Sequence, residues 1–139
     1  MNYRLKKIRQ LKKSENWEKN INILGDADQI VQLLFILVDN ALKYTDRNGS
    51  INITCKVDGN CVVLEITDTG IGIDNKDIEK IYDRFYRNET ARQKNEEGSG
   101  LGLSIAKEIA DKHNATIRVK SKKGKGTTFQ ITFKKNNLQ

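Results

Sequence analysis

Two glycine clusters are the residues of this 139-residue chain whose types and spacing best suit ligand chemistry. Residues 68–73 read DTGIGI, and residues 98–103, about 25 residues later, read GSGLGL. Glycine lets a backbone approach a ligand closely and adopt positive φ. The second cluster opens a helix-like run, and the free N–H groups at a helix N-terminus suit phosphate. The pair therefore predicts a nucleotide site whose two walls are separated by a polar segment.

Two widespread nucleotide motifs do not fit these clusters. The dinucleotide-binding fingerprint needs glycine at its sixth position, where Leu103 stands. A phosphate-binding loop of the form GxxxxGK followed by Ser or Thr is absent from the sequence. Residues 124–127, GKGT, are more simply interpreted as a hairpin turn. The site must therefore belong to another nucleotide-binding architecture.

Periodic apolar residues predict the helices that would position these clusters. With Asp26 as N-cap, a strong helix runs to about Thr45. Its buried face comprises Ile30, Leu33, Leu34, Leu37, Ala41 and Leu42. A second strong helix is predicted over residues 101–113 and a short one over 76–82. Apolar residues at helical spacing in residues 3–19 indicate a short amphipathic helix or the remnant of a longer parent chain.

Strand patterns complete the fold class. Residues 50–57 and 61–67 predict a hairpin about the turn Asp58-Gly59. A short strand is expected over 21–24, and two further strands, 115–120 and 127–133, flank a turn at 122–126. Strands interleaved with a few helices predict a mixed sheet covered by helices on one face.

The cysteines and the apolar runs bear on location. Alternation along the predicted hairpin places Cys55 and Cys61 on opposite faces, which excludes a disulfide between them and suits a reducing cytoplasm. The longest apolar run, residues 33–38, has six residues, against about 20 for a membrane span. No signal peptide is visible at the N-terminus. We expect a cytoplasmic domain that does not insert into a membrane, with a parent protein that is either soluble or membrane-anchored.

The net charge of +7 raises the alternative of a nucleic-acid module. Positive charge is densest at residues 4–13 and 120–125. The aromatic residues cluster at 82–86 and do not interleave with these basic ends. We therefore interpret the basic segments as solvated surfaces and expect no nucleic-acid partner.

Five short strings resemble, in order, the conserved boxes of sensor histidine kinases. Residues 39–45 (DNALKYT) resemble the asparagine box, and residues 68–72 the first glycine box. Residues 82–87 (YDRFYR) resemble the phenylalanine box, although Tyr82 stands where Phe is typical. Residues 98–103 and 124–127 resemble the remaining glycine boxes.

The resemblance implies the Bergerat fold, a two-layer α/β sandwich shared with gyrase, Hsp90 and MutL-type ATPases. It implies a linker or short helix over residues 1–20 and an ATP-binding catalytic domain over 21–139. Within that domain, a mobile lid is expected at about 74–98.

Roles for individual residues follow from the same resemblance. Asn40 would hold Mg²⁺, since a neutral amide oxygen suits a hard cation that phosphates also bind. Asp68 would accept a hydrogen bond from the adenine amino group, and Thr127 would support the adenine through water. Arg87 and Arg84 would reach the γ-phosphate once the lid closes, and Lys43 would face the phosphates, so that these cations stabilise the transferring phosphoryl group. The remaining implied ATP contacts are Tyr44, Gly70, Gly72, Ile73, Phe85, Gly98, Ser99, Gly100, Leu101, Gly102 and Leu103.

The expected reaction is transfer of the γ-phosphoryl group of ATP·Mg to a histidine on a separate dimerisation domain, with a response regulator downstream. His113, the sole histidine, ends a predicted helix and lacks the acidic neighbour of a phosphoacceptor. Ile36 stands four residues before Asn40, where relatives carry a second asparagine or the glutamate that activates water. Isoleucine can neither bind a metal ion nor activate water, which argues against ATP hydrolysis. A serine kinase of the anti-sigma type and an ATP-binding degenerate kinase remain as alternatives.

Overall fold

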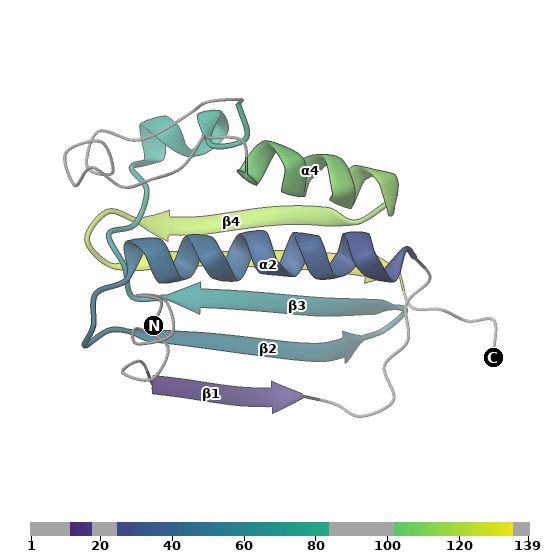
Figure 1. The fold of residues 1–139 in the computed structure, drawn as a ribbon, viewed down its shortest axis with the longest axis horizontal. Helices are drawn as coiled ribbons and strands as arrows, with labels where there is room; N and C mark the ends of the chain where they lie inside the picture. The colour runs from purple at the N-terminus through teal and green to yellow at the C-terminus, as the bar shows by residue number, and fades with distance from the viewer. Residues whose placement is uncertain (1–11, 18–24, 84–101, 135–139) are drawn as a thin grey trace.

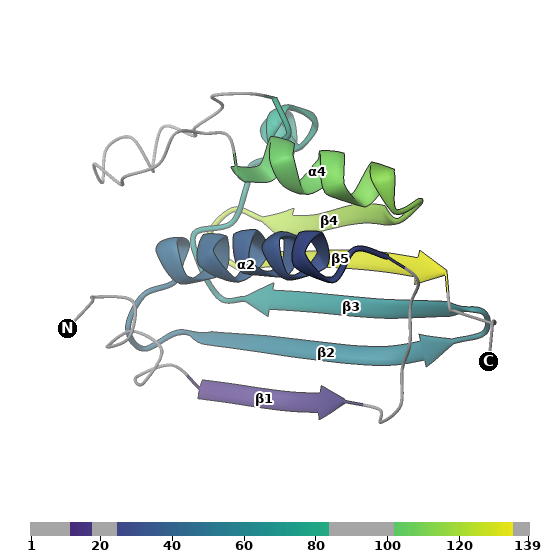
Figure 2. The ribbon, with the colours of Figure 1, turned by 45° about the vertical axis from the view of Figure 1, so that its right-hand side comes forward.

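A computed structural model describes residues 12–17, 25–83 and 102–134. The elements are β1 (Lys12–Trp17), α2 (Ala27–Tyr44), β2 (Ser50–Asp58), β3 (Cys61–Asp68), the 3₁₀ helix η1 (Asn75–Lys80), α4 (Gly102–Lys112), β4 (Thr116–Lys122) and β5 (Gly126–Lys134). The five strands form one sheet in the order β1-β2-β3-β5-β4, with α2 and α4 on the same face (Figures 1 and 2). The pair β1–β2 is parallel and the other pairs are antiparallel. The predicted mixed, two-layer α/β fold is confirmed.

Helix α2 forms the centre of the helical layer. The Asp26 carboxylate caps its N-terminus by accepting a hydrogen bond from the Gln29 N–H at 3.1 Å. Its buried positions are Leu33, Leu37, Ala41 and Leu42, and the other two predicted positions, Ile30 and Leu34, are partly buried against the core. These side chains pack on the apolar face of β3 and β5, which the sheet supplies through alternate residues such as Ile66 and Ile131.

The hairpin between β2 and β3 differs from its predicted register. Asp58 pairs with Cys61 and Val57 with Val62, so the two-residue loop is Gly59-Asn60 and not Asp58-Gly59. Gly59 adopts φ 61°, which a type II′ turn requires at its first loop position. The observed register shifts each cross-strand pair by two residues relative to the prediction, so each side chain stays on its predicted face of the sheet. Cys55 and Cys61 lie on opposite faces and form no disulfide.

The N-terminal segment is a second correction. Residues 12–17, which the sequence placed in an amphipathic helix over 3–19, form strand β1 instead. β1 pairs with β2 along its whole length, from Lys12 opposite Ser50 to Trp17 opposite Cys55. Pairing with the edge of a formed sheet outweighs a weak local helical pattern. Residues 1–11 and the predicted strand 21–24 lie outside the described residues, and the domain boundary at residue 20 stays a prediction.

The remaining predicted elements are confirmed with small shifts. α4 occupies most of the predicted helix 101–113, and η1 covers most of 76–82 as a 3₁₀ helix. Directly after η1, Ile81 is 3% exposed and belongs to the core, so the first part of the predicted lid packs against the domain. Within the described ranges, no helix is long and apolar enough to cross a membrane.

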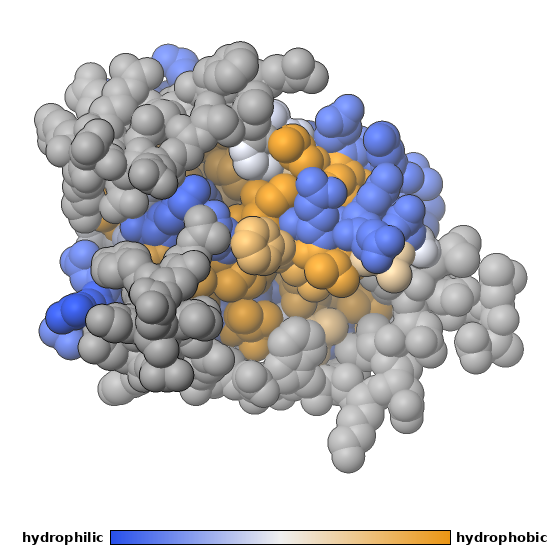
Figure 3. All heavy atoms as spheres, viewed as in Figure 1, coloured by the Kyte–Doolittle hydropathy of each residue, from blue (hydrophilic) through white to orange (hydrophobic). Residues whose placement is uncertain are grey.

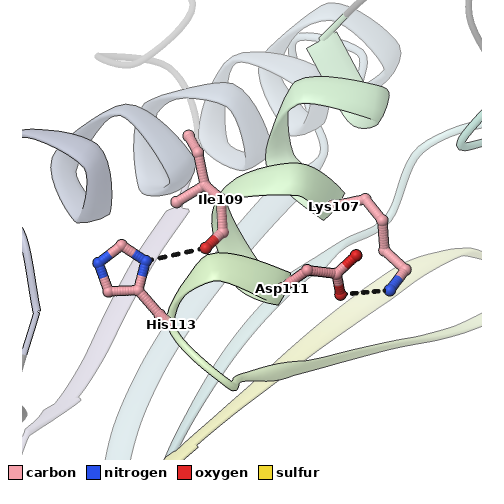
Figure 4. Close-up of polar contacts among 4 residues, drawn as sticks. All are labelled: Lys107, Ile109, Asp111 and His113. Atoms are coloured by element: carbon pink, nitrogen blue, oxygen red, sulfur yellow. Dashed lines mark hydrogen bonds and ion pairs between the residues drawn. The ribbon is translucent and has the colours of Figure 1, made fainter.

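His113 links helix α4 to helix α2. Its Nδ1–H donates to the Ile109 carbonyl at 2.8 Å, because a carbonyl oxygen only accepts (Figure 4). Its Nε2 therefore accepts, from the Asp26 N–H at 3.0 Å. The C-terminal end of α4 is thus tied to the N-cap of α2. Nearby on α4, Lys107 and Asp111 form an ion pair of 2.6 Å on its exposed side.

Two large apolar side chains of α2 remain outside the core. Val31 and Phe35 are 63% and 61% exposed, and apolar surface is visible over the middle of α2 in Figure 3. Leu37, on the opposite side of the same helix, is fully buried. The two sides of α2 therefore differ sharply in how much they contribute to stability.

We predict that Leu37→Ala lowers the free energy of unfolding by about 3 kcal/mol, because it removes a fully buried side chain and leaves a cavity. Val31→Ala is the matched control on the same helix, and it should change the free energy of unfolding by less than about 0.5 kcal/mol. Urea unfolding followed by circular dichroism measures both. Equal effects of the two substitutions would contradict the assigned orientation of α2.

Candidate nucleotide-binding site

A row of three polar side chains crosses one end of the sheet. Asp68 ends β3, Thr127 lies opposite it on β5, and Ser121 lies opposite Thr127 on β4. The residues two positions away from the row on the same face of the three strands pack into the core. These residues are Ile66, Phe129 and Val119. The row therefore lies on the helix-covered face, where the apolar core gives way to polar groups.

The Asp68 carboxylate is held by backbone N–H groups. It is 8% exposed, and its Oδ1 accepts from the Gly70 N–H at 2.8 Å and from the Thr127 N–H at 3.2 Å. Burial raises the pKa of Asp68 above its ordinary value, and the two N–H donors partly oppose this rise. Both hydrogen bonds to Asp68 within the described residues end on Oδ1, so Oδ2 is the oxygen available to accept from a ligand.

The loop after Asp68 packs backbone against backbone. The Ile71 N–H donates to the Tyr44 carbonyl at 3.1 Å, and the Gly124 N–H donates to the Ile71 carbonyl at 2.7 Å. A methyl group on Gly70 would overlap the Tyr44 carbonyl, and one on Gly72, which has φ 71°, would overlap the Lys122 carbonyl. These two glycines are therefore required by contacts within the protein. Their predicted contact with adenine stays a prediction.

The last turns of α2 bring the predicted metal and phosphate residues to the same region. Through its carbonyl, Tyr44 contacts the loop that begins at Asp68. Asn40 is half-buried one turn earlier on the helix. Lys43 forms a 3.3 Å ion pair with Asp39, so its ammonium group is already paired with a carboxylate before a ligand binds. Such a partly exposed pair contributes little stability, so Lys43 is available for exchange to a phosphate.

The N-terminus of α4 lies beside the middle of α2. A methyl group built on Gly102, the first residue of α4, would lie 3.4 Å from Ile36 Cγ2. Leu103 is partly buried against the core and holds the first turn in place. The structure therefore brings the start of α4 to the same helix that carries Asn40 and Lys43. The predicted site residues Arg84, Phe85, Arg87, Gly98, Ser99, Gly100 and Leu101 lie outside the described residues.

Two buried hydroxyl groups have no hydrogen-bond partner within the described ranges, those of Thr45 and Tyr82. Burial raises the pKa of Tyr82 to about 12, so its phenol is neutral at physiological pH. The Tyr82 ring packs against the core. This is the role that phenylalanine, the typical residue at that position, would also perform.

Ser121 is the site residue that sequence reasoning missed. Its hydroxyl contacts the Ile73 N–H at 2.7 Å and Thr127 Oγ1 at 2.7 Å. A serine between lysines near the end of a strand carries little signal by itself. Its position in the row follows from the pairing of β4 with β5, which the motif strings do not contain.

Comparison with known proteins identifies the family of the chain. Residues 25–137 match the family described as histidine kinase-, DNA gyrase B- and HSP90-like ATPases. The match covers most of the chain, including α2, the Asp68 loop and the β4–β5 turn. The chain belongs to this family.

The chain is similar to curated proteins and solved structures that are named as histidine kinases. The chain is 43% identical over 115 residues to the signal transduction histidine-protein kinase ArlS of Staphylococcus aureus, covering 83% of the chain and 26% of that kinase. The mycobacterial sensor histidine kinase MprB superimposes with a TM-score of 0.80 at 25% identity, covering 96% of this chain and 90% of that one. The catalytic domain of histidine kinase ThkA gives 0.77 at 28% identity, covering 94% and 86%. The chain thus spans about a quarter of the length of the curated relatives it matches.

We predict that Gly126→Ala lowers the free energy of unfolding by more than about 2 kcal/mol. Its φ is 112°, and the added methyl group would overlap the Asp68 carbonyl. Gly124→Ala is the matched control: φ is 82° there, but the space is open, so only the backbone strain of about 1 kcal/mol applies. Thermal and urea unfolding measure both variants. A cost at Gly126 no larger than at Gly124 would contradict the close approach of β5 to Asp68.

Proposed function

We propose that this domain binds ATP with Mg²⁺ and transfers the γ-phosphoryl group to a histidine on a separate dimerisation domain. A response regulator would then receive the phosphoryl group. The family match and the histidine-kinase names of the relatives support this assignment. These relatives do not favour the alternative of a serine kinase of the anti-sigma type.

The observation that carries the proposal is the geometry of Asp68. A buried carboxylate is costly unless hydrogen bonds stabilise it. Here two backbone N–H groups fix Oδ1, and no hydrogen bond within the described residues ends on Oδ2. An acceptor in this position matches the exocyclic amino group of adenine. Beside it, the Gly70–Tyr44 and Gly72–Lys122 contacts form a backbone wall against which a planar base would pack.

We place Mg²⁺ at Asn40. Within the described ranges, no three His, Cys, Asp or Glu side chains lie close enough to form a metal site by themselves. We propose that phosphate oxygens of the nucleotide supply the other ligands, as is usual for this hard cation. The bound ion would neutralise phosphate charge during transfer. Ile36, one turn before Asn40, would contribute no ligand.

The acceptor histidine is proposed to lie outside this chain. Both ring nitrogens of His113 are engaged in hydrogen bonds that tie α4 to α2, so this side chain has a structural role. The apolar Ile36 offers no base to activate water, which favours transfer to an external acceptor over hydrolysis. Arg84, Arg87 and Lys43 are the proposed cations for the transferring group. We further propose that the domain works in the cytoplasm, where ATP is available and cysteines remain reduced.

We predict that Asp68→Asn weakens ATP binding at least about a hundredfold while the fold is retained. The amide oxygen can keep both backbone hydrogen bonds, but the NH₂ group would then face the adenine amino group. Isothermal titration with a non-hydrolysable ATP analogue measures the affinity. An unchanged affinity would exclude Asp68 as the adenine acceptor.

The same variant tests the pKa of Asp68. Because the folded-state pKa is raised, the stability that Asp68 contributes is present below its ordinary pKa of 3.8 and is lost as pH rises through the raised value. Asp68→Asn does not titrate. We therefore expect the stability of the wild type relative to Asp68→Asn to fall as pH rises from 3.8 through the raised pKa of Asp68. A wild type that instead gains stability over the variant with rising pH would contradict the raised pKa.

We predict that Asn40→Asp increases the gain in nucleotide affinity that Mg²⁺ provides, because the added carboxylate repels the phosphates when the ion is absent and binds the ion when it is present. Asn52→Asp, an exposed position on β2, is the control for added charge. Calorimetric titrations with and without Mg²⁺, beside ADP, measure the effect. An unaffected metal dependence in Asn40→Asp would count against Asn40 as the ligand, and wild-type binding that ignores Mg²⁺ would indicate a degenerate kinase.

A further inference from the structure

The hydroxyl of Ser121 makes three short polar contacts at the end of β4. It lies 2.7 Å from the Ile73 nitrogen, 2.9 Å from the Gly126 carbonyl oxygen and 2.7 Å from Thr127 Oγ1. These partners belong to the loop after Asp68 and to β5. One side chain therefore links two segments that border the proposed base pocket.

The chemistry of the partners determines where each proton lies. The Ile73 N–H only donates and the Gly126 carbonyl only accepts, so Ser121 accepts from Ile73 and donates its single proton to Gly126. The contact with Thr127 is then a hydrogen bond only if Thr127 donates. This arrangement satisfies all three contacts, and any other leaves one oxygen pair without a proton between them.

This assignment fixes what Thr127 can offer to a ligand. Thr127 is 7% exposed and lies directly opposite Asp68 in the β3–β5 register. Its only hydroxyl proton points toward Ser121, so lone pairs remain on its other side. Asp68 Oδ2 and Thr127 Oγ1 belong to directly opposite residues, and both then offer lone pairs to a ligand.

We propose that Ser121 is a positioning residue that sets the nucleotide-base specificity of the site. By accepting the hydrogen bond that the Thr127 hydroxyl donates, Ser121 leaves only lone pairs of Thr127 Oγ1 and Asp68 Oδ2 for the ligand. These two oxygens pair with an exocyclic amino group and repel an oxygen at the same position of the base. The inference rests on the proposed function, in which Asp68 accepts from the adenine amino group. Ser121 itself need not touch the nucleotide.

The test compares ATP with inosine triphosphate, which carries an oxygen where adenine carries its amino group. In the wild type, ATP should bind much more tightly. In Ser121→Ala, the Thr127 proton is released and can be donated to the inosine oxygen. We expect the ratio of the two dissociation constants, inosine triphosphate to ATP, to fall about tenfold. A purely structural role for Ser121 would weaken both ligands equally and leave the ratio unchanged, which would overturn the proposal.

Two further variants keep the result decisive. Ser121→Thr retains the hydroxyl and should restore most of the ATP preference. Thr127→Val removes the acceptor itself, so adding Ser121→Ala to it should change the ratio no further, because both substitutions act through one oxygen. An additive change in the double variant would contradict the proposed coupling, and Thr127→Val still tests the acceptor if Ser121→Ala fails to fold.

The control variant is Thr128→Val. Thr128 is the next residue on β5, but it lies on the opposite sheet face, where its hydroxyl pairs with that of Thr67 at 3.0 Å. Its loss should leave the ratio unchanged. Asp68→Asn in the same assay separates the proposed role of Asp68 from that of Ser121. If the wild type does not bind ATP, the proposed function fails, and if Asp68→Asn binds ATP normally, the adenine role of Asp68 fails. Loss of ATP binding in Asp68→Asn with an unchanged ratio in Ser121→Ala overturns the role of Ser121 alone.

Discussion

Burial of the Asp68 carboxylate is the constraint on which this site depends. A charge at the edge of an apolar core is stable only if fixed donors surround it. Asp68 obtains them from its own loop, through Gly70, and from β5, through Thr127. The second donor requires β5 to approach the backbone of β3 so closely that position 126 has no room for a side chain. The carboxylate, the loop and the β4–β5 turn are therefore one unit.

The same unit joins the two layers of the domain. The Tyr44 carbonyl, at the end of α2, accepts from the loop after Asp68, and the β4–β5 turn packs on the other side of that loop. At the opposite end of the helical layer, His113 ties α4 to the N-cap of α2. Among the described residues, Asn40, Lys43 and Asp68 are thus carried by elements that hydrogen bonds of the backbone hold together around the loop after Asp68.

Where sequence patterns failed, a non-local interaction decided the outcome. The segment 12–17 carries a weak helical pattern, yet it pairs with β2 at the sheet edge. The hairpin turn lies one residue later than Asp58-Gly59, because pairing of Asp58 with Cys61 places Gly59 where positive φ is needed. The buried faces were nevertheless predicted correctly, since alternation along a strand is insensitive to a shift of two residues.

The sequence by itself determined the elements with strong periodicity and the residues in ordered motifs. Helix α2 with its Asp26 cap and the apolar faces of the strands follow from local spacing, and the candidates Asp68, Asn40 and Thr127 follow from the resemblance of the ordered motifs to those of sensor histidine kinases. The tertiary structure alone decided how these residues are used. Gly72 and Gly126 face the backbone of distant strands, and Ser121 orients the Thr127 hydroxyl. Such roles depend on strand register and on the direction of individual protons. Both are set by pairing between segments far apart in the chain, which no local pattern encodes.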